Sequence, residues 1–329
     1  PSAGNVVAVS DYNSTAGTNN ITIARNGSNI NGSASNLVIS KANSAIQLVY
    51  VDATTGWQGV ATASEGDILN TFVAATGGTI TTCGDFKIHT FTGPGTFTVT
   101  SGGTASGSNA VDYLVVAGGG GASSAGGGAG GYRESCGTCY TSSPLGACVS
   151  ALPVTAQAYP ITVGGGGSAG APVSNLGGTG NNSIFSTITS AGGGGGRALD
   201  STGQDGGSGS GASGGGSGGN RAGGDGNTPP VSPPQGNNGG TSAPAPGAGG
   251  AGGGATSVGA NASGTNGGNG GNGATSSING TPTARAGGGG SGMYGPSGSG
   301  GGGGPGGGGV GSGSNTGTGT AGTANTGGG

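Results

Sequence analysis

The chain has 329 residues, of which only 5% are charged and 4% aromatic, and its formal net charge is −3. Without an excess of Lys and Arg no basic surface is indicated, so we do not expect nucleic acid as a partner. No apolar run approaches the roughly 18 residues of a membrane-spanning helix. The sequence starts at Pro1 without a signal peptide, which indicates a processed product or a fragment.

Residues 1–62 are rich in Asn, Ser, Thr and Gly and contain only short apolar stretches. The expected strands are 21–23, 37–39 and 45–51. They bury too little apolar surface for the core of a single chain. We therefore expect a β-rich fibre-shaft segment in which three chains share an axial core capped by Trp57. A small independent β-domain is the alternative.

Residues 63–84 are interpreted as a connector. Its apolar residues are Ile68, Leu69, Phe72 and Val73, for which a short helix is one interpretation.

Residues 85–117 are expected to form a small β-platform. Apolar alternation on both sides of Gly93-Pro94-Gly95 predicts a hairpin between strands 85–91 and 96–100. His89, the single histidine, falls in this hairpin and is expected on a sheet face. The strands expected to join the platform are 111–117, 152–163 and, with a weaker pattern, 182–190.

The composition changes abruptly after Ala117. Of the 93 glycines, 78 lie in residues 118–329, so more than one residue in three is glycine there and no ordinary apolar core can form. A flexible linker or low-complexity tail is one interpretation. Collagen needs glycine at every third position, and the consecutive glycines at 118–121 break that period.

The spacing of the glycine runs favours a third interpretation, a bundle of polyglycine-II helices. Such a helix has three residues per turn, a rise of about 3.1 Å and no internal hydrogen bonds, so its backbone groups are free to bond to its neighbours. The runs alternate with segments rich in Ser, Thr, Asn and Pro, as expected for rods joined by loops. We therefore predict an all-β chain plus a polyglycine-II helix bundle over 118–329, with no substantial α-helix.

The four cysteines are Cys83, Cys136, Cys139 and Cys148. A zinc site around the Cys136-Gly-Thr-Cys139 motif would need a nearby further ligand, for which only Cys83 or His89 is available. We favour structural disulfides in an extracellular setting, with zinc and free thiols as alternatives.

Several segments resemble the glycine-rich domain common in bacteriophage tail proteins. The matching segments are 85–100, 111–121, 130–134, 159–164 and 183–192. The stretches 20–28 and 48–57 resemble the shaft of phage fibres. Members of the family often end in a further apolar strand, which this chain lacks. The resemblance implies a fibre or adhesin at a virion surface. The more distantly similar glycine-rich tip adhesins of T-even-like phages carry receptor-binding loops between polyglycine helices, which implies a glycine-rich tip domain here.

No catalytic constellation is present, and we expect no enzyme activity, no cofactor and no metal. Large side chains and stiff prolines set among glycines suit a binding surface, because they offer contact area at a low entropy cost. The candidate receptor-binding residues are Tyr140, Pro230, Val231, Pro233, Met293 and Tyr294. Tyr132 and Arg133 are expected to pack on the platform instead.

The sequence thus predicts a non-enzymatic virion fibre or adhesin, located on the virion surface or outside the cell. Its expected partners are two further copies of itself in a homotrimer, other tail or capsid proteins, and a host surface glycan or outer-membrane protein. The alternatives are a purely structural fibre, such as a capsid head fibre or spacer, and a secreted ice-binding protein.

Overall fold

The computed structural model describes residues 1–62, 72–103, 108–137, 140–147, 149–170, 176–198, 200–214, 219–314 and 317–329. The chain divides into two compact units, Pro1–Val73 with Ser101–Asn109, and Ala74–Thr100 with Ala110–Gly329. Within the described residues the one helical element is a 3-10 turn, η1 (Pro144–Gly146). The predicted all-β class without substantial α-helix is therefore confirmed. In the same residues no helix has the length and apolar composition needed to cross a bilayer.

The first unit is a small β-fold. Its strands are β1 (Val6–Ser10), β2 (Ile21–Ile23), β3 (Leu37–Ile39), β4 (Ala45–Asp52) and β5 (Gly56–Thr62). They form an antiparallel sheet in the order β1-β4-β5 and a separate β2-β3 pair. The three predicted strands are thus confirmed.

A modest core forms within the single first unit. The buried apolar side chains there are Ala16, Ile30, Ile39 and Leu48. The ring of Trp57 packs edge-on against Tyr50 across β4 and β5, with ring centroids 5.4 Å apart. One chain therefore does bury a small core, and the sharing of a core among three chains stays a prediction.

Asp11 organises the loops of this unit. Its carboxylate accepts hydrogen bonds from the backbone N–H groups of Ala16 (3.0 Å), Thr15 (3.1 Å) and Asn43 (3.1 Å). The Ala16 bond is foremost among the causes that hold the pKa of Asp11 below its usual value, since these bonds stabilise the charged form. Asp11 thereby ties together two loops that lie far apart in the sequence.

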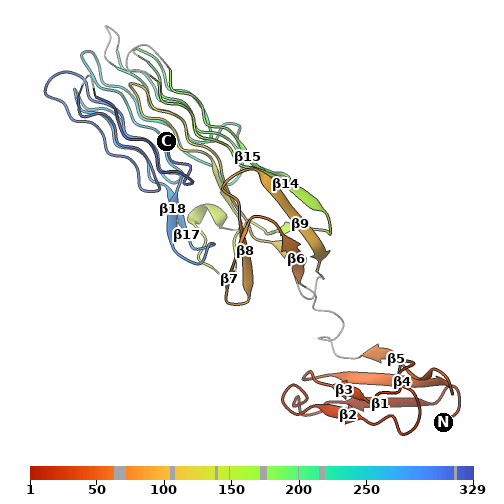
Figure 1. Cartoon of the computed structure of the whole chain (residues 1–329). Helices are drawn as coiled ribbons and strands as arrows, with labels where there is room; N and C mark the ends of the chain where they lie inside the picture. Colours follow the sequence, from red (N-terminus) through yellow and green to blue (C-terminus); the bar gives the residue numbers. More distant parts are fainter. Residues whose placement is uncertain are drawn as a thin grey trace. The chain divides into compact units, whose positions relative to one another are not determined.

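The second unit begins with a platform of short strands. The strands are β6 (Val73–Thr76), β7 (Thr79–Cys83), β8 (Phe86–Thr90), β9 (Gly95–Gly102), β10 (Ala110–Val111), β11 (Leu114–Val116), β12 (Tyr132–Glu134), β13 (Leu152–Pro153), β14 (Ala158–Thr162), β15 (Ser183–Phe185), β16 (Ile188–Ser190), β17 (Ala274–Ser276) and β18 (Thr283–Arg285). The largest sheet has the order β16-β15-β14-β9-β6, and the pairs β7-β8, β10-β13, β11-β12 and β17-β18 stand beside it. Phe97, Tyr159 and Phe185 pack their rings together on this sheet, with centroids 5.8 to 6.4 Å apart. Figure 1 shows the platform below the glycine-rich part of the same unit.

The predicted hairpin around Gly93-Pro94-Gly95 is wrong. The strand β8 pairs with β7, whereas β9 pairs with β14 and β6. The two residues Gly84 and Asp85 close the β7-β8 hairpin, and Gly84 has the positive φ (56°) that such tight turns need. Residues 93–95 instead connect two different sheets.

The interpretation of 63–84 as a mere connector is also wrong, because this range contains the whole of β6 and of β7. Val73 begins a strand, so the helical interpretation fails there, and Phe72 is exposed. Ile68 and Leu69 lie outside the described residues.

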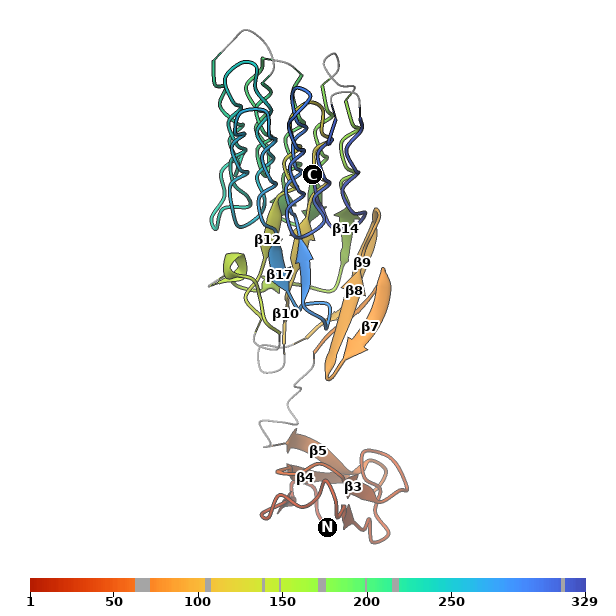
Figure 2. The ribbon, with the colours of Figure 1, turned by 90° about the vertical axis from the view of Figure 1, so that its left-hand side faces the viewer.

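After Ala117 the chain runs back and forth in extended glycine-rich segments, here called rods, which lie side by side (Figure 2). In the rod 125–131, residues three apart donate their N–H groups to the same neighbour. One such pair donates to the rod 249–254 (3.2 and 3.0 Å), the next to the rod 191–196 (2.8 Å each), and Gly130 to 327–329 (2.9 Å). Three residues per turn is the period of a polyglycine-II helix.

The carbonyl groups of the rod 125–131 accept from three further rods. The donors belong to 118–121 (2.8 Å), 207–214 (2.9 and 3.0 Å) and 286–292 (2.9 Å). This rod therefore has six neighbours, all bonded through the backbone. The predicted polyglycine-II bundle is confirmed in the described rods, whereas β12, β17 and β18, which also lie within 118–329, are strands.

Glycine is required where the rods meet. A β-carbon on Gly252 would overlap the carbonyl oxygen of Gly127, and one on Gly211 would overlap that of Gly250. Where interior rod positions do carry side chains, these are small. Examples with no exposed surface are Ala125, Ala212, Ala251, Ser208 and Ser210.

Candidate functional site

The rods turn at two ends, which differ in their surroundings. At the strand end they run directly into the platform, as Gly131 continues into β12 and Ala191 follows β16. At the opposite end, here called the free end, loops connect neighbouring rods without any strand (Figure 2). The described free-end loops are 122–124, 243–247, 262–266 and 293–298.

Met293 and Tyr294 lie in a free-end loop. The N–H of Met293 donates to the Ser312 carbonyl (3.1 Å), and that of Tyr294 donates to the Thr265 carbonyl (3.0 Å). Both side chains are partly exposed. The backbone of this loop is therefore fixed by its neighbours, while its two large side chains remain available.

The proline-rich loop that contains Pro230, Val231 and Pro233 lies at the strand end. The side chain of Asn227 accepts hydrogen bonds from the N–H groups of Val231 (3.0 Å) and Gln235 (3.2 Å).

Gln235 fastens this loop to the base of the bundle. Its side chain is 1% exposed, donates to the Pro229 carbonyl (2.9 Å) and accepts from the N–H of Ala191 (2.8 Å). These bonds hold the loop in place, but it is at the other end of the bundle from Met293 and Tyr294.

Tyr140 also belongs to the strand end. Its hydroxyl donates to the Ser135 carbonyl (2.7 Å), and burial raises its pKa. The ring stacks so closely on the backbone that a β-carbon on Gly137 would overlap it. The six predicted receptor-binding residues therefore do not form one site, and only Met293 and Tyr294 reach the free end.

Beneath the rods, the strand end contains a buried polar cluster that the sequence did not reveal. Glu134, 2% exposed, accepts hydrogen bonds through Oε2 from the Tyr132 hydroxyl (3.0 Å) and from the N–H (2.9 Å) and hydroxyl (2.6 Å) of Ser143. Burial, reinforced by the neighbouring Glu134, raises the pKa of Tyr132. The cluster fixes the loop after β12 to the platform. It also accounts for Tyr132, which packs there as expected.

Two of the four cysteines can be placed. Cys83 and Cys136 are exposed free thiols, so the disulfides expected for these two are not present. Cys83 ends β7 at the tip of the β7-β8 hairpin, and Cys136 lies in the loop after β12. Cys139 and Cys148 lie outside the described residues.

The described residues offer no ligand set for the alternative, a zinc site. There, no three His, Cys, Asp or Glu side chains come together to hold a metal ion. The His89 Nδ1 lies 2.8 Å from the Gly77 carbonyl, and the ring packs edge-on against Phe97 at 5.1 Å.

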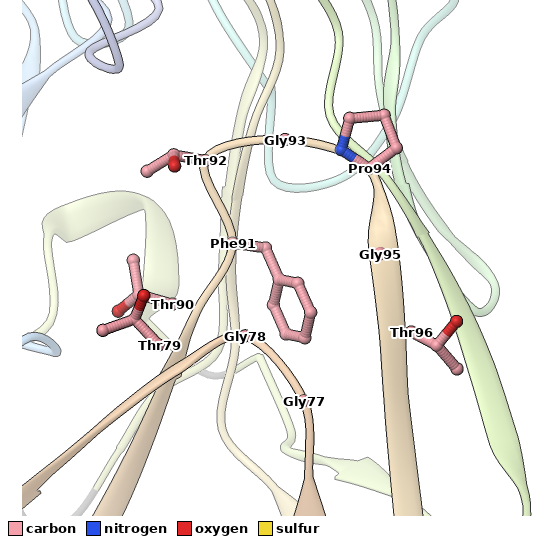
Figure 3. A pocket seen from close by; sticks show the side chains of 10 residues that line it. All are labelled: Gly77, Gly78, Thr79, Thr90, Phe91, Thr92, Gly93, Pro94, Gly95 and Thr96. Carbon is pink, nitrogen blue, oxygen red and sulfur yellow. The ribbon is translucent and has the colours of Figure 1, made fainter.

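A shallow hollow of about 440 Å³ lies between the turn at Gly77 and Gly78 and the connection 90–96 (Figure 3). Phe91 points into it, and a β-carbon on Gly78 or Gly95 would come within 3.0 to 3.1 Å of that ring. The other side chains around it belong to threonines and Pro94. The hollow has no titratable group, so its chemistry is limited to weak hydroxyl and apolar contacts.

The free end also carries two arginines that sequence reasoning did not select, Arg197 and Arg221. The sequence does offer a signal for them, because arginine is rare in the tract 118–329, which has only four. In both, the Nε atom is buried and has no hydrogen-bond partner in the described part of the chain.

These features define a class of protein in which a strand platform carries a bundle of backbone-bonded glycine rods. The glycine-rich domain family matches residues 89–329, which is well over half of the chain. The chain therefore belongs to the glycine-rich domain family. No curated protein and no solved structure is significantly similar to it. The match covers most of the second unit and leaves residues 1–73 of the first unit outside.

Proposed function

We propose that this chain is a virion fibre or adhesin protein that binds a host surface glycan or outer-membrane protein without catalysis. The observation that supports this most is the free end of the bundle. There, loops with large side chains project from a scaffold that has almost none.

The rigidity of the rods makes the free end a suitable binding surface. The backbone of the 293–298 loop is bonded to two neighbouring segments, at Ser312 and Thr265. A loop that is ordered before binding loses less entropy when it meets its ligand. Met293 and Tyr294 then provide the large contact area that binding hot spots use.

The first unit has an exposed edge strand that is suited to self-association. The edge strand β1 exposes Val6 (52%) and Val7 (43%), and its outer edge has no strand partner in the described part of the first unit. Apolar edge strands of this kind pair readily with other chains. We propose the homotrimer here, and light scattering that shows a stable monomer would contradict it. The attachment to other tail or capsid proteins belongs to the same proposal.

The proposed binding is tested with the full chain, fluorescently labelled and incubated with a panel of Gram-negative and Gram-positive cells. The double variant M293A/Y294A should lower binding to the responsive cells at least about tenfold, as expected for the loss of hot-spot side chains. The matched control is Val231→Ala, which changes a proline-loop side chain at the strand end and should leave binding within twofold.

A loss of binding in the Val231→Ala control but not in M293A/Y294A would contradict the free-end surface. An absence of binding to every cell type would favour a purely structural fibre, and thermal hysteresis in the same preparation would favour an ice-binding protein.

A further inference from the structure

The charges of the glycine-rich tract separate by end. Its eight charged side chains are Arg133, Glu134, Arg197, Asp200, Asp205, Arg221, Asp225 and Arg285. Arg133, Glu134 and Arg285 lie in platform strands, and the N–H of Asp225 bonds to the side chain of Asp205 (2.7 Å) near a strand-end turn. The three that remain lie toward the free end, namely Arg197, Asp200 and Arg221. The formal charge of these three side chains is therefore slightly positive.

The hydrogen-bond register places the two arginines at nearly the same level along the bundle. The N–H of Gly203 donates to the Ala222 carbonyl (2.8 Å), so Arg221 lies beside Thr202. A β-carbon on Gly194 would overlap the Gln204 carbonyl, so these two residues are adjacent. Arg197 is three residues further toward the free end and is therefore level with Ser201.

The segment 201–204 thus lies between the rods of Arg197 and Arg221. Bonded extended segments lie about 4.8 Å apart, so the two Cα atoms are separated by no more than roughly 10 Å. Two long guanidinium side chains can meet over one anion across that gap.

Arg197 and Arg221 share one feature of their guanidinium groups. In each, the Nε donor is buried without an acceptor in the described residues, whereas Arg133 and Arg285 each donate from Nη1 to a carbonyl at 3.5 Å. A buried donor without an acceptor is costly, and this cost is removed when the partly exposed side chain turns its Nε toward an incoming anion. Planar guanidinium forks bind phosphate and carboxylate groups with two parallel hydrogen bonds.

We propose that Arg197 and Arg221 form an anion-binding site that recognises the phosphate or carboxylate groups of a surface polysaccharide. This inference rests on the proposed function and names the class of its ligand. Asp200, which directly precedes Ser201, is the one side-chain carboxylate of the glycine-rich tract toward the free end.

The test measures binding of the full chain to sodium polyphosphate, to polygalacturonate and to neutral dextran at 50 and 300 mM NaCl. The chain should bind one of the two polyanions and not dextran, and binding should weaken with salt. The double variant R197Q/R221Q should raise the Kd for that polyanion at least tenfold. The control Arg285→Gln, which changes a strand-end arginine, should stay within twofold.

The choice between polyphosphate and polygalacturonate identifies the anion. A lack of binding to both polyanions at 50 mM NaCl, or an equal loss in Arg285→Gln, would overturn the site. Amide exchange in the rods checks that R197Q/R221Q is folded. If that variant binds cells like the unaltered chain while M293A/Y294A does not, the anion site fails and the proposed function stands.

Discussion

The two units of this chain build their interiors from different groups, apolar side chains in the first and backbone in the second. The first unit hides a few apolar side chains, such as Leu48 at 3% exposure, and leaves Val6, Val7 and Tyr12 exposed at 52, 43 and 94%. In the described rods of the bundle the backbone is buried, and the interior positions there carry no side chain larger than that of Ala or Ser. An interior can therefore be built from peptide groups alone, provided that every rod has neighbours.

The energetic terms explain why neighbours are needed. Ordering a residue costs roughly 1–2 kcal/mol of conformational entropy, and more for glycine. One intramolecular hydrogen bond contributes only about 0.5–1.5 kcal/mol to the net free energy of folding. An interior rod such as 125–131 uses both its N–H and its C=O groups, on six sides. A lone rod would use neither and would not persist.

The largest effect should come from adding one methyl group to the interior of the bundle. In Gly252→Ala the new β-carbon overlaps the carbonyl oxygen of Gly127, so the rods must separate and the Gly252 bonds to Gly289 and Gly271 weaken. We expect a loss of at least about 3 kcal/mol in the free energy of unfolding of the second unit. Thermal unfolding followed by circular dichroism measures it.

The matched control is Gly313→Ala, where a β-carbon meets nothing within 4 Å. This variant should change stability by less than about 1 kcal/mol, and in the stabilising direction. Equal losses in both variants would mean that close approach is not what the glycines provide.

The next effect tests the side-chain core of the first unit. Leu48→Ala removes a side chain that is 3% exposed, and we expect a loss of about 2–4 kcal/mol in that unit. The exposed Val51 on the same strand is the control, and Val51→Ala should cost less than about 1 kcal/mol. Chemical denaturation monitored by Trp57 fluorescence reports on this unit. A Leu48→Ala variant with the stability of the unaltered chain would show that Leu48 does not contribute to a stabilising core in the single chain.

The smallest effect is a pH dependence confined to the first unit. Hydrogen bonds hold the pKa of Asp11 lower in the folded chain than in the unfolded chain. Their stabilisation is therefore present above the unfolded value and is lost as the pH falls through the folded value. Between pH 6 and pH 3 the unaltered chain should lose more stability in this unit than Asp11→Asn does. Parallel pH curves for the two proteins would exclude this role of Asp11.

Composition predicted the bundle well, because only a backbone-bonded interior reconciles so much glycine with regularly spaced loops. The platform was harder to predict. The stretch Thr79–Cys83 is mostly polar, which concealed β7, and the pairing of β9 with β14 joins residues about sixty positions apart. Local patterns favoured the nearer partner, and the Gly93-Pro94-Gly95 turn was mistaken for a hairpin.

The sequence did not assign the candidate binding residues to a particular end of the bundle. Successive rods alternate in direction, so each further pass moves the next loop to the opposite end. The pass 201–205 contains a single glycine, and its composition looks like part of a loop. Missing one pass inverts the end assigned to every later loop, so the sequence alone does not show whether the proline-rich loop at 228–235 or the loop at Met293 lies at the free end.

The central claim is that lateral backbone hydrogen bonds hold the rods together, and site-resolved amide hydrogen exchange tests it most directly. The interior donors Gly128, Gly211 and Gly252 should exchange at least about a thousandfold more slowly than an unfolded glycine chain. Exchange of these three amides at the rate of an unfolded chain would contradict the account.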